Sequence, residues 1–303
     1  MRLALAPMQD VTDLAFMRTL ARVGSLPDVF LTAYFRSTPT TCALAAQNLR
    51  CILENETGVP VIAQLAGSDA AALVRDARYL QTLPVAGINL NAGCPSPLVC
   101  RHGAGAGLLR DIPNFRAVAQ ALRDVVPAGH FSIKCRLGWQ SDDEFDSVLA
   151  VLQDAKPDEV TVHARTKRDV YGGVPRMQYV RQAVQGLSCP VLANGDLNTP
   201  EQVTDCVAYT GAAGAMIGRG AVRNPFIFRQ LRGDAAPTRE EMRAYYRILL
   251  EETGKILDNR TEKGHCNRMK KYLAFCYGDF TEEEEYKLRR CTHTDDMLAI
   301  LSQ

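Results

Sequence analysis

The sequence predicts an α/β protein, a (β/α)8 TIM barrel followed by a small C-terminal all-helical domain. Over about the first 230 residues, short apolar runs of strand length alternate with segments of helical periodicity. A barrel of this kind needs roughly 250 residues, which the 303-residue chain can supply together with a small appendage. Polar side chains recur at the ends of many separate apolar runs, which favours the barrel over a doubly wound sheet.

The predicted elements follow from apolar periodicity and from turn residues between the runs. The eight strand candidates are Leu3–Ala6, Val29–Thr32, Val61–Gln64, Gly87–Asn91, Ser132–Arg136, Glu159–His163, Pro190–Ala193 and Ala213–Ile217. Segments with helical spacing lie between them, for example Ala70–Leu80, Phe115–Val125, Phe145–Leu152 and Pro200–Tyr209.

The strand-like runs stop near residue 233, which divides the chain into residues 1–232 and 233–303. Gly233–Pro237 has the composition of a linker. Thr238 and Glu241 then have the spacing of a capping box at a helix start. Beyond it we expect helices near 239–257, 262–277, 281–290 and 293–302.

Composition and charge limit the class of protein. The formal net charge is +1, so the overall field gives little evidence of a polyanionic partner. No run approaches the roughly 18 apolar residues of a membrane helix, and the first residues do not match a signal peptide, so we expect a cytoplasmic protein without a membrane partner. The ten cysteines lack zinc-ligand spacing, which predicts reduced thiols and no metal.

The segment Gly87–Gly107 carries the most informative pattern. A predicted strand ends at Asn91, and the chain then turns at Gly93 and Pro95 with Cys94 between them. We interpret the glycine-rich residues 96–107 as a flexible loop that could close over Cys94. On position alone, Cys94 is either a reactive thiol at the mouth of a barrel or a small buried apolar residue.

Other strand ends carry residues suited to a phosphorylated cofactor. Barrels often bind phosphate at the loops after the seventh and eighth strands, which here are Asn194–Asp196 and Gly218–Gly220. Gln64, Lys134 and His163 are placed to reach the barrel mouth. A lysine in a run as apolar as S-I-K-C-R-L needs a counter-charge, which a flavin would supply. No G-x-G-x-x-G fingerprint indicates a Rossmann NAD domain.

Several motifs together resemble those of the dihydrouridine synthases, flavin enzymes that reduce uridine in RNA. The central one is N-x-N-x-G-C-P-S at 89–96, followed by G-x-G-A-x-L-L-like residues. The others, in the family's order, are A-P-M-Q-D-V-T-D at 6, Q-L at 64, K-C-R-L-G-W at 134, V-H-A-R-T-K at 162, A-N-G-D at 193 and M-I-G-R-G-A at 216. The pattern covers most of residues 1–230 and is closest to bacterial members of the C and B types.

The resemblance implies a cofactor, a reductant and a proton donor. NADPH would reduce FMN, hydride would pass from flavin N5 to C6 of uracil, and Cys94 would protonate C5. The uridine would flip out of its stack to reach the site. The family's FMN-binding positions correspond here to Pro7, Met8, Gln9, Gln64, Lys134, His163, Asn194, Gly195, Asp196, Gly218 and Arg219.

The resemblance also implies an RNA substrate, with tRNA expected and ribosomal RNA as the alternative. We expect Asn91 to orient the uracil edge, and Arg165 and Lys167 to hold the nucleotide's phosphate. The helical domain would help to bind RNA, and the chain would act as a monomer. Further expected substrate contacts are Arg36, Arg268, Lys270 and Lys271.

Two departures from the family pattern leave other readings open. Ala33 stands where the family commonly has an acidic residue, and Pro97 where it often has lysine. One alternative is a free-pyrimidine flavin oxidoreductase of the dihydroorotate or dihydropyrimidine dehydrogenase kind. Another is a non-catalytic RNA-binding barrel, and a third is a phosphosugar-type barrel without flavin.

Overall fold

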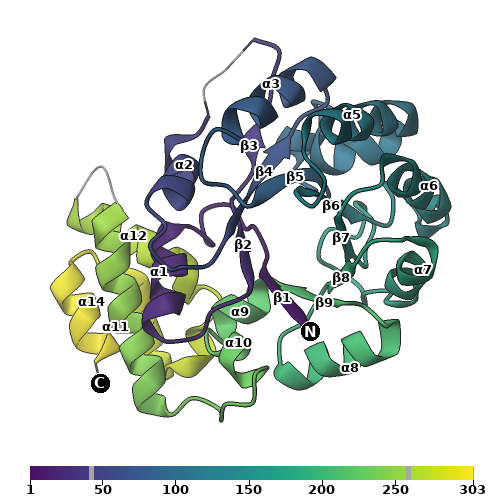
Figure 1. The fold of residues 1–303 in the computed structure, drawn as a ribbon. Helices are drawn as coiled ribbons and strands as arrows, with labels where there is room; N and C mark the ends of the chain where they lie inside the picture. The colour runs from purple at the N-terminus through teal and green to yellow at the C-terminus, as the bar shows by residue number, and fades with distance from the viewer. Residues whose placement is uncertain (41–43, 257–260, 303) are drawn as a thin grey trace.

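A computed structural model of the chain describes residues 1–40, 44–256 and 261–302. Within these residues nine parallel strands form one sheet in the order β2-β1-β9-β8-β7-β6-β5-β4-β3, and β2 also pairs with β4, which closes the barrel (Figure 1). The predicted (β/α)8 barrel is therefore confirmed. The strands are β1 (Arg2–Leu5), β2 (Val29–Leu31), β3 (Phe35–Arg36), β4 (Val61–Ala66), β5 (Gly87–Ala92), β6 (Phe131–Arg136), β7 (Glu159–His163), β8 (Val191–Asn194) and β9 (Gly214–Ile217).

Each predicted strand overlaps an observed one, and the short β3 is an addition that the sequence pattern did not reveal. Helices separate the strands and cover the outside of the barrel (Figure 1). They are α1 (Leu14–Arg22), α2 (Ala46–Leu53), α3 (Ala70–Leu80), α4 (Pro97–Cys100), α5 (Ile112–Val125), α6 (Phe145–Ala155), α7 (Gln178–Gly186), α8 (Pro200–Thr210), α9 (Arg219–Arg223) and α10 (Ile227–Gln230). Side-chain caps fix several starts: Asp69 accepts from Ala72 N at 2.8 Å at the start of α3.

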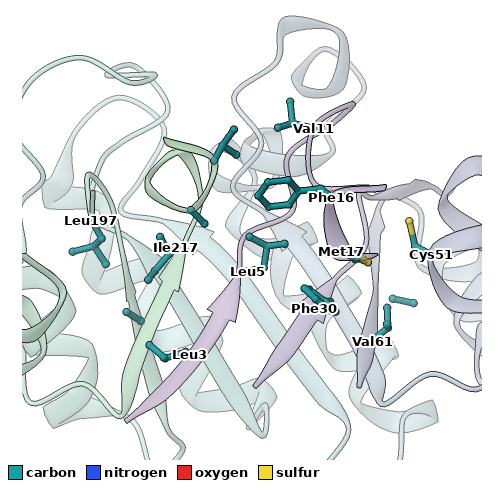
Figure 2. Close-up of a cluster of buried hydrophobic side chains, with 14 of the residues drawn as sticks. Leu3, Leu5, Val11, Phe16, Met17, Phe30, Cys51, Val61, Leu197 and Ile217 are labelled. Carbon is teal, nitrogen blue, oxygen red and sulfur yellow. The ribbon is translucent and has the colours of Figure 1, made fainter. Parts of the chain in front are cut away.

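The core has two layers, because side chains alternate across each strand. Leu5 of β1 and Phe30 of β2 belong to the larger cluster together with Phe16 and Met17 of α1, between the barrel wall and the helices (Figure 2). The alternate residues of β1 and its neighbours form a smaller cluster that fills the barrel interior. Its members are Ala4, Ala6, Val29, Leu31, Ile62, Leu192 and Met216.

The residues after the barrel are helical, with α11 (Arg239–Ile256), α12 (Glu262–Leu273), α13 (Glu282–Arg290) and α14 (Thr294–Leu301). Leu257, the last residue of the first predicted helix, lies outside the described residues. The predicted capping box is present, since Thr238 Oγ1 accepts from Glu241 N at 3.2 Å and Glu241 Oε2 from Thr238 N at 2.8 Å. No helix in the described ranges is both long enough and apolar enough to cross a membrane.

Helix α11 packs against α1, the first helix of the barrel, and α12 reaches it through an aromatic contact (Figure 1). The ring of Tyr272 stacks on Phe16 with centroids 6.1 Å apart. Arg22 pairs with Glu252 at 2.8 Å. Buried aromatic and charged contacts therefore join the barrel to the segment that follows it.

Residues 96–107 differ from the flexible loop that their glycines suggest. Pro97 begins the short α4, and Gly105–Arg110 forms a 3-10 turn. Val99 and Ala106 are buried, as is Cys100. The apolar residues between the glycines anchor this segment to the barrel, and proline favours a helix's first turn.

Candidate active site

A cavity of about 920 Å³ lies at the carboxyl ends of the barrel strands. Parallel strands bring these ends to one face, which gathers residues far apart in the chain. Cys94, Asn91 and Lys167 line the cavity. So do all the expected FMN-binding residues except Gln64, namely Pro7, Met8, Gln9, Lys134, His163, Asn194, Gly195, Asp196, Gly218 and Arg219. The remaining expected RNA contacts, Arg36, Arg165, Arg268, Lys270 and Lys271, are not part of its lining.

Cys94 is held in the wall of the cavity by its backbone. Asn91 Oδ1 accepts from Gly93 N at 3.0 Å and from Cys94 N at 2.9 Å. The carbonyl of Cys94 accepts from Ala106 N at 3.0 Å, so the segment after α4 supports the turn from the other side. The side chain is thereby fixed at the end of β5.

Burial raises the pKa of the Cys94 thiol above its ordinary value. The backbone N–H of Ser96 and the cations Arg136 and Lys134 offset this only in part. The thiol is therefore protonated at neutral pH. A protonated thiol at a cavity wall can act as a proton donor to a bound substrate.

Asn91 is the centre of a buried chain of amides. Its Nδ2 donates to Gln64 Oε1 at 2.8 Å, and Gln64 Nε2 donates to Asn89 Oδ1 at 2.8 Å. Asn89 Nδ2 in turn donates to Ser132 Oγ at 2.8 Å. Gln64 is fully buried below the cavity, where it orients Asn91. Asn91 therefore holds the cysteine turn with its amide oxygen and is itself held by Gln64 through its amide nitrogen.

Lys134 projects from β6 into the cavity and has no carboxylate partner among the described residues. Its Nζ donates to Asn194 Oδ1 at 3.1 Å, and Asn194 Nδ2 donates to Met216 O at 2.7 Å. Burial and the nearby Arg136 lower the pKa of Lys134 from 10.5 to about 8. The expected need for a counter-charge is thus unmet within the protein.

Two further groups, His163 and Arg136, line the cavity near Lys134. Burial, helped by Arg136 and Lys134, lowers the pKa of His163 well below 6.5, so its imidazole is neutral at pH 7. Arg136 is 1% exposed and donates to Gly93 O and to Thr166 O, each at 2.8 Å. It therefore supports the cysteine turn from beneath. Alternation along β6 places Lys134 and Arg136 on the same side, a signal that could have identified Arg136 from the sequence.

Asp196 sits between two arginines at the edge of the cavity. Arg219 Nη2 lies 2.5 Å from Asp196 Oδ1, and Arg165 Nη1 lies 3.1 Å from the same oxygen. The hydrogen bond from Arg165 is the largest cause that holds the pKa of Asp196 below its ordinary value. One carboxylate therefore faces two guanidinium groups.

The sequence suggested that Arg165 contacts a phosphate of the nucleotide, but in the structure its side chain is buried. It is 1% exposed, and it also donates to Gly172 O at 2.8 Å and Gly173 O at 2.6 Å. Its guanidinium orders the loop after β7 and Asp196, and it presents no free charge to a nucleotide. Lys167, in the same loop, lies over the Trp139 ring at 4.3 Å and lines the cavity.

The glycines after β9 have separate tasks. A Cβ on Gly220 would lie 2.1 Å from Leu197 O, so this glycine allows two backbone segments to touch. A Cβ on Gly218 would lie 3.5 Å from Met8 Sδ, at the cavity wall. Both glycines line the cavity, and Gly220 also permits the backbone contact with Leu197.

Three aromatic side chains line the cavity: Tyr34 and Tyr171, which the sequence did not indicate, and Phe275, which the sequence placed only among aromatics near the basic residues of the helical domain. Tyr171 is 55% exposed and lies under Arg219, with 5.0 Å from ring centroid to guanidinium carbon. Phe275 follows α12, so the C-terminal helices contribute to the cavity wall. No local periodicity marks these positions, because their neighbours in space come from distant segments.

The basic residues of α12 are largely engaged within the protein. Arg268 is 8% exposed and pairs with Asp13, whose other oxygen accepts from Tyr272 at 2.8 Å. Lys270 donates to Cys291 O at 2.7 Å. Lys271 pairs with Asp10 at 2.9 Å, but half of its side chain remains exposed. Of the three, only Lys271 presents much of its charge to solvent.

Neither metal ligands nor disulfides characterise this site. No group of three or more His, Cys, Asp or Glu side chains in the described ranges could hold a metal ion. The cysteines of those ranges are free, and Cys42 lies outside them.

Comparison with known proteins agrees with this arrangement. The sequence model of the dihydrouridine synthase family matches residues 4–302. A tRNA-dihydrouridine(16) synthase of Haemophilus influenzae is 30% identical over 100% of both chains. One of Cupriavidus necator is 34% identical over 79% of this chain and 77% of its own. The tRNA-dihydrouridine synthase B of Pseudomonas aeruginosa is 34% identical over 76% and 68%, respectively.

Solved structures show the fold alone, because their sequence identity is low. An old yellow enzyme homologue from Zymomonas mobilis superposes with a TM-score of 0.56 and 12% identity, over 78% of this chain and 90% of that one. A 2-naphthoyl-CoA reductase gives 0.59 and 10%, over 76% and 50%. The family model matches nearly the whole sequence, and a relative is 30% identical over the full length of both chains. The chain therefore belongs to the dihydrouridine synthase family.

Proposed function

We propose that this protein reduces a uridine of tRNA to 5,6-dihydrouridine, with FMN as cofactor, NADPH as reductant and Cys94 as the proton donor. The observation that carries the proposal is the raised pKa of Cys94 in the wall of a cationic cavity at the strand ends. Relatives at 30–34% identity are named tRNA-dihydrouridine(16) synthases, which supports uridine 16 as the target.

The residues present fit a phosphorylated flavin. A cavity of about 920 Å³ is in the range of cofactor sites. The cationic side chains that line the cavity outnumber its one carboxylate, Asp196, which pairs with Arg219. Lys134 has no anionic partner among the described residues. Bound here, FMN would supply a two-electron reduction, with NADPH as the source of hydride and C6 of uracil as its destination.

The chain's own groups would perform the remaining tasks. Arg219 and the backbone near Gly195 and Gly218 would hold the phosphate, and Lys134 would face the electron-rich edge of the ring. Cys94 would donate its proton to C5 of the uracil. Asn91, Gln64 and Arg136 would position the cysteine turn. These roles follow from the contacts that each side chain makes.

We also propose that residues 1–232 carry the chemistry and residues 233–303 help to bind RNA, in a monomeric enzyme. Lys167, Lys271 and Phe275 lie at or near the cavity mouth and are the best placed to meet a nucleic acid. Arg268 and Lys270 would contribute by fixing α12 against the barrel and the C-terminal end of α13. The phosphate contact that the sequence suggested for Arg165 is replaced by a supporting role.

The test is mass spectrometric quantification of dihydrouridine at each position of separated tRNA and rRNA, from cells with and without the gene. We expect loss of dihydrouridine at tRNA position 16. Expression of the wild-type protein in cells without the gene should restore dihydrouridine, and so should expression of Cys189→Ala, a control that removes a thiol at the opposite end of the barrel. Expression of Cys94→Ala should not restore it. Unchanged tRNA together with a yellow purified protein would favour a free-pyrimidine reductase, and loss confined to rRNA would change the substrate.

A further inference from the structure

A second cavity, of about 470 Å³, has both polar and apolar atoms in its wall. Arg36, Ser37 and Thr38 form one wall, at the end of β3. Ser68 and Asp69, before α3, and His102, after α4, complete it. All three segments follow the carboxyl ends of strands, so this cavity opens on the same face of the barrel as the first.

Its wall contains a buried hydroxyl without a partner. Ser37 is 5% exposed, and its Oγ makes no hydrogen bond with any described residue. The hydroxyl of Thr38 is likewise buried and unpaired within the described ranges. Buried polar groups nearly always have partners, so these two adjacent residues of the cavity wall have donor capacity that the described residues do not satisfy.

The charges favour an anion. Arg36 is exposed at the rim and forms no ion pair with a described residue. The one carboxylate, Asp69, is engaged as the cap of α3, where it accepts from Ala72 N at 2.8 Å. Ser68 Oγ donates to His102 O at 2.7 Å, which fixes the opposite wall. A free guanidinium beside two donor hydroxyls suits phosphate oxygens.

The two cavities are close along the chain. Tyr34 lines the first and Arg36 the second, so at most about 7 Å of extended backbone separates them. A polynucleotide that places a base in the first cavity therefore passes its backbone near the second. We propose that the second cavity binds a backbone phosphate of the RNA beside the reduced uridine.

This inference rests on the proposed function, and it adds a positioning contact to it. Phosphate contacts fix the register of a nucleic acid without reading its sequence. Arg36 would supply charge, and Ser37 and Thr38 would donate to the phosphate oxygens. The flipped uridine would then be held on one side by its neighbouring phosphodiester.

The experiment compares Arg36→Ala, Ser37→Ala and the control Arg78→Ala, an exposed arginine on α3 that lines neither cavity. Affinity for an unmodified tRNA transcript is measured over a range of salt concentrations, with flavin absorbance as a check of folding. We expect Arg36→Ala to reduce the slope of log affinity against log salt by about 0.7–0.9. Ser37→Ala should bind roughly tenfold more weakly.

Ser37→Ala also gives a signature that a merely structural role would not produce. Because its hydroxyl is unpaired in the free protein, we expect the variant to melt at the same temperature as wild type or above it, while binding RNA less well. A transcript with a neutral methylphosphonate beside the target uridine should weaken wild type, and should weaken Ser37→Ala and Arg36→Ala much less.

The outcomes separate failure of the phosphate site from failure of the proposed function. Wild-type RNA binding with no loss in Arg36→Ala or Ser37→Ala would overturn the phosphate site and leave the proposed function standing. Absence of RNA binding by wild type would overturn both. If inorganic phosphate raises the melting temperature of wild type but not of Ser37→Ala, while both bind RNA equally, the cavity takes free phosphate and the RNA contact is refuted.

Discussion

Replacement of Lys134 by methionine tests the electrostatics of the cavity directly. The pKa of Lys134 falls from 10.5 to about 8 because the charged form is buried beside Arg136. A difference of this size between the folded and unfolded chain corresponds to about 3 kcal/mol of destabilisation at pH 7. Its ammonium borders a cavity that water enters in the flavin-free protein, so we expect the measured cost to be about 1–3 kcal/mol.

The sign of the pH dependence follows from the same values. Below about pH 8 both folded and unfolded chains carry the charge, and the full penalty is present. Between about pH 8 and 10.5 the unfolded chain keeps the proton that the folded chain has lost, so rising pH relieves the penalty. The advantage of Lys134→Met over wild type should therefore be greatest at pH 7 and shrink toward pH 10.

The assay is urea unfolding of flavin-free wild type, Lys134→Met and the exposed-lysine control Lys263→Met, from pH 7 to about 9.5. The raised pKa values of the buried cysteines make the free energy of unfolding fall as pH rises, which is opposite to the effect of Lys134. Comparing the variants with wild type at the same pH removes this shared contribution. Lys134→Met should be the more stable protein and yet bind FMN more weakly, because it lacks the charge that we propose faces the flavin. A variant less stable than wild type at pH 7, or a difference that does not change with pH, would refute the reasoning.

Three further predictions concern the thiol, its support and the contact between barrel and helices. Because burial raises the pKa of Cys94, its alkylation by iodoacetamide, followed by peptide mass spectrometry, should still accelerate above pH 9; a plateau by pH 8 would contradict this. Asn91→Ala leaves two backbone N–H groups and the Gln64 carbonyl unpaired, so urea unfolding should show a loss of about 3 kcal/mol, with product formation falling more than FMN affinity. Unchanged stability would remove Asn91 from the supporting chain. Asp13→Asn leaves the buried Arg268 without its nearest anion, which should cost about 3 kcal/mol and speed proteolysis near residue 235; equal cleavage rates in wild type and variant would argue against this role.

Much of the fold could be predicted because it depends on local pattern. Apolar runs of strand length, interrupted by Gly, Pro and Asn, identified each long barrel strand, and parallel strands then bring their carboxyl ends together by geometry alone. This is why Cys94, Lys134 and His163, separated by tens of residues, could be expected at one cavity. The short β3 lacked enough residues to show a period.

The roles of individual cations could not be predicted in the same way. Arg165 and Lys167 are only two residues apart, yet Arg165 is buried against Asp196 and Lys167 reaches the cavity. Arg268 likewise looks like part of an exposed basic stretch until its partner Asp13, in the barrel, is seen. A partner 31 or 255 positions away leaves no trace in local periodicity.

Residues 96–107 show a related limit. Glycines predicted a flexible loop, but Val99, Cys100 and Ala106 pack against the barrel and fix a helical path. Glycine there serves close approach, since a Cβ on Gly105 would lie 2.9 Å from Cys94 O. Glycine content indicates how flexible a backbone segment can be, but it does not show the packing contacts that restrict the segment to one conformation.

The most direct test of the central claim uses purified protein, FMN, NADPH and an unmodified tRNA transcript, with dihydrouridine measured by mass spectrometry. Wild type should form dihydrouridine at position 16, while Cys94→Ala should bind flavin, oxidise NADPH and form almost none. Equal product from Cys94→Ala would contradict the assignment of the proton donor. A wild-type enzyme that reduces free uracil and leaves the tRNA unchanged would contradict the account as a whole.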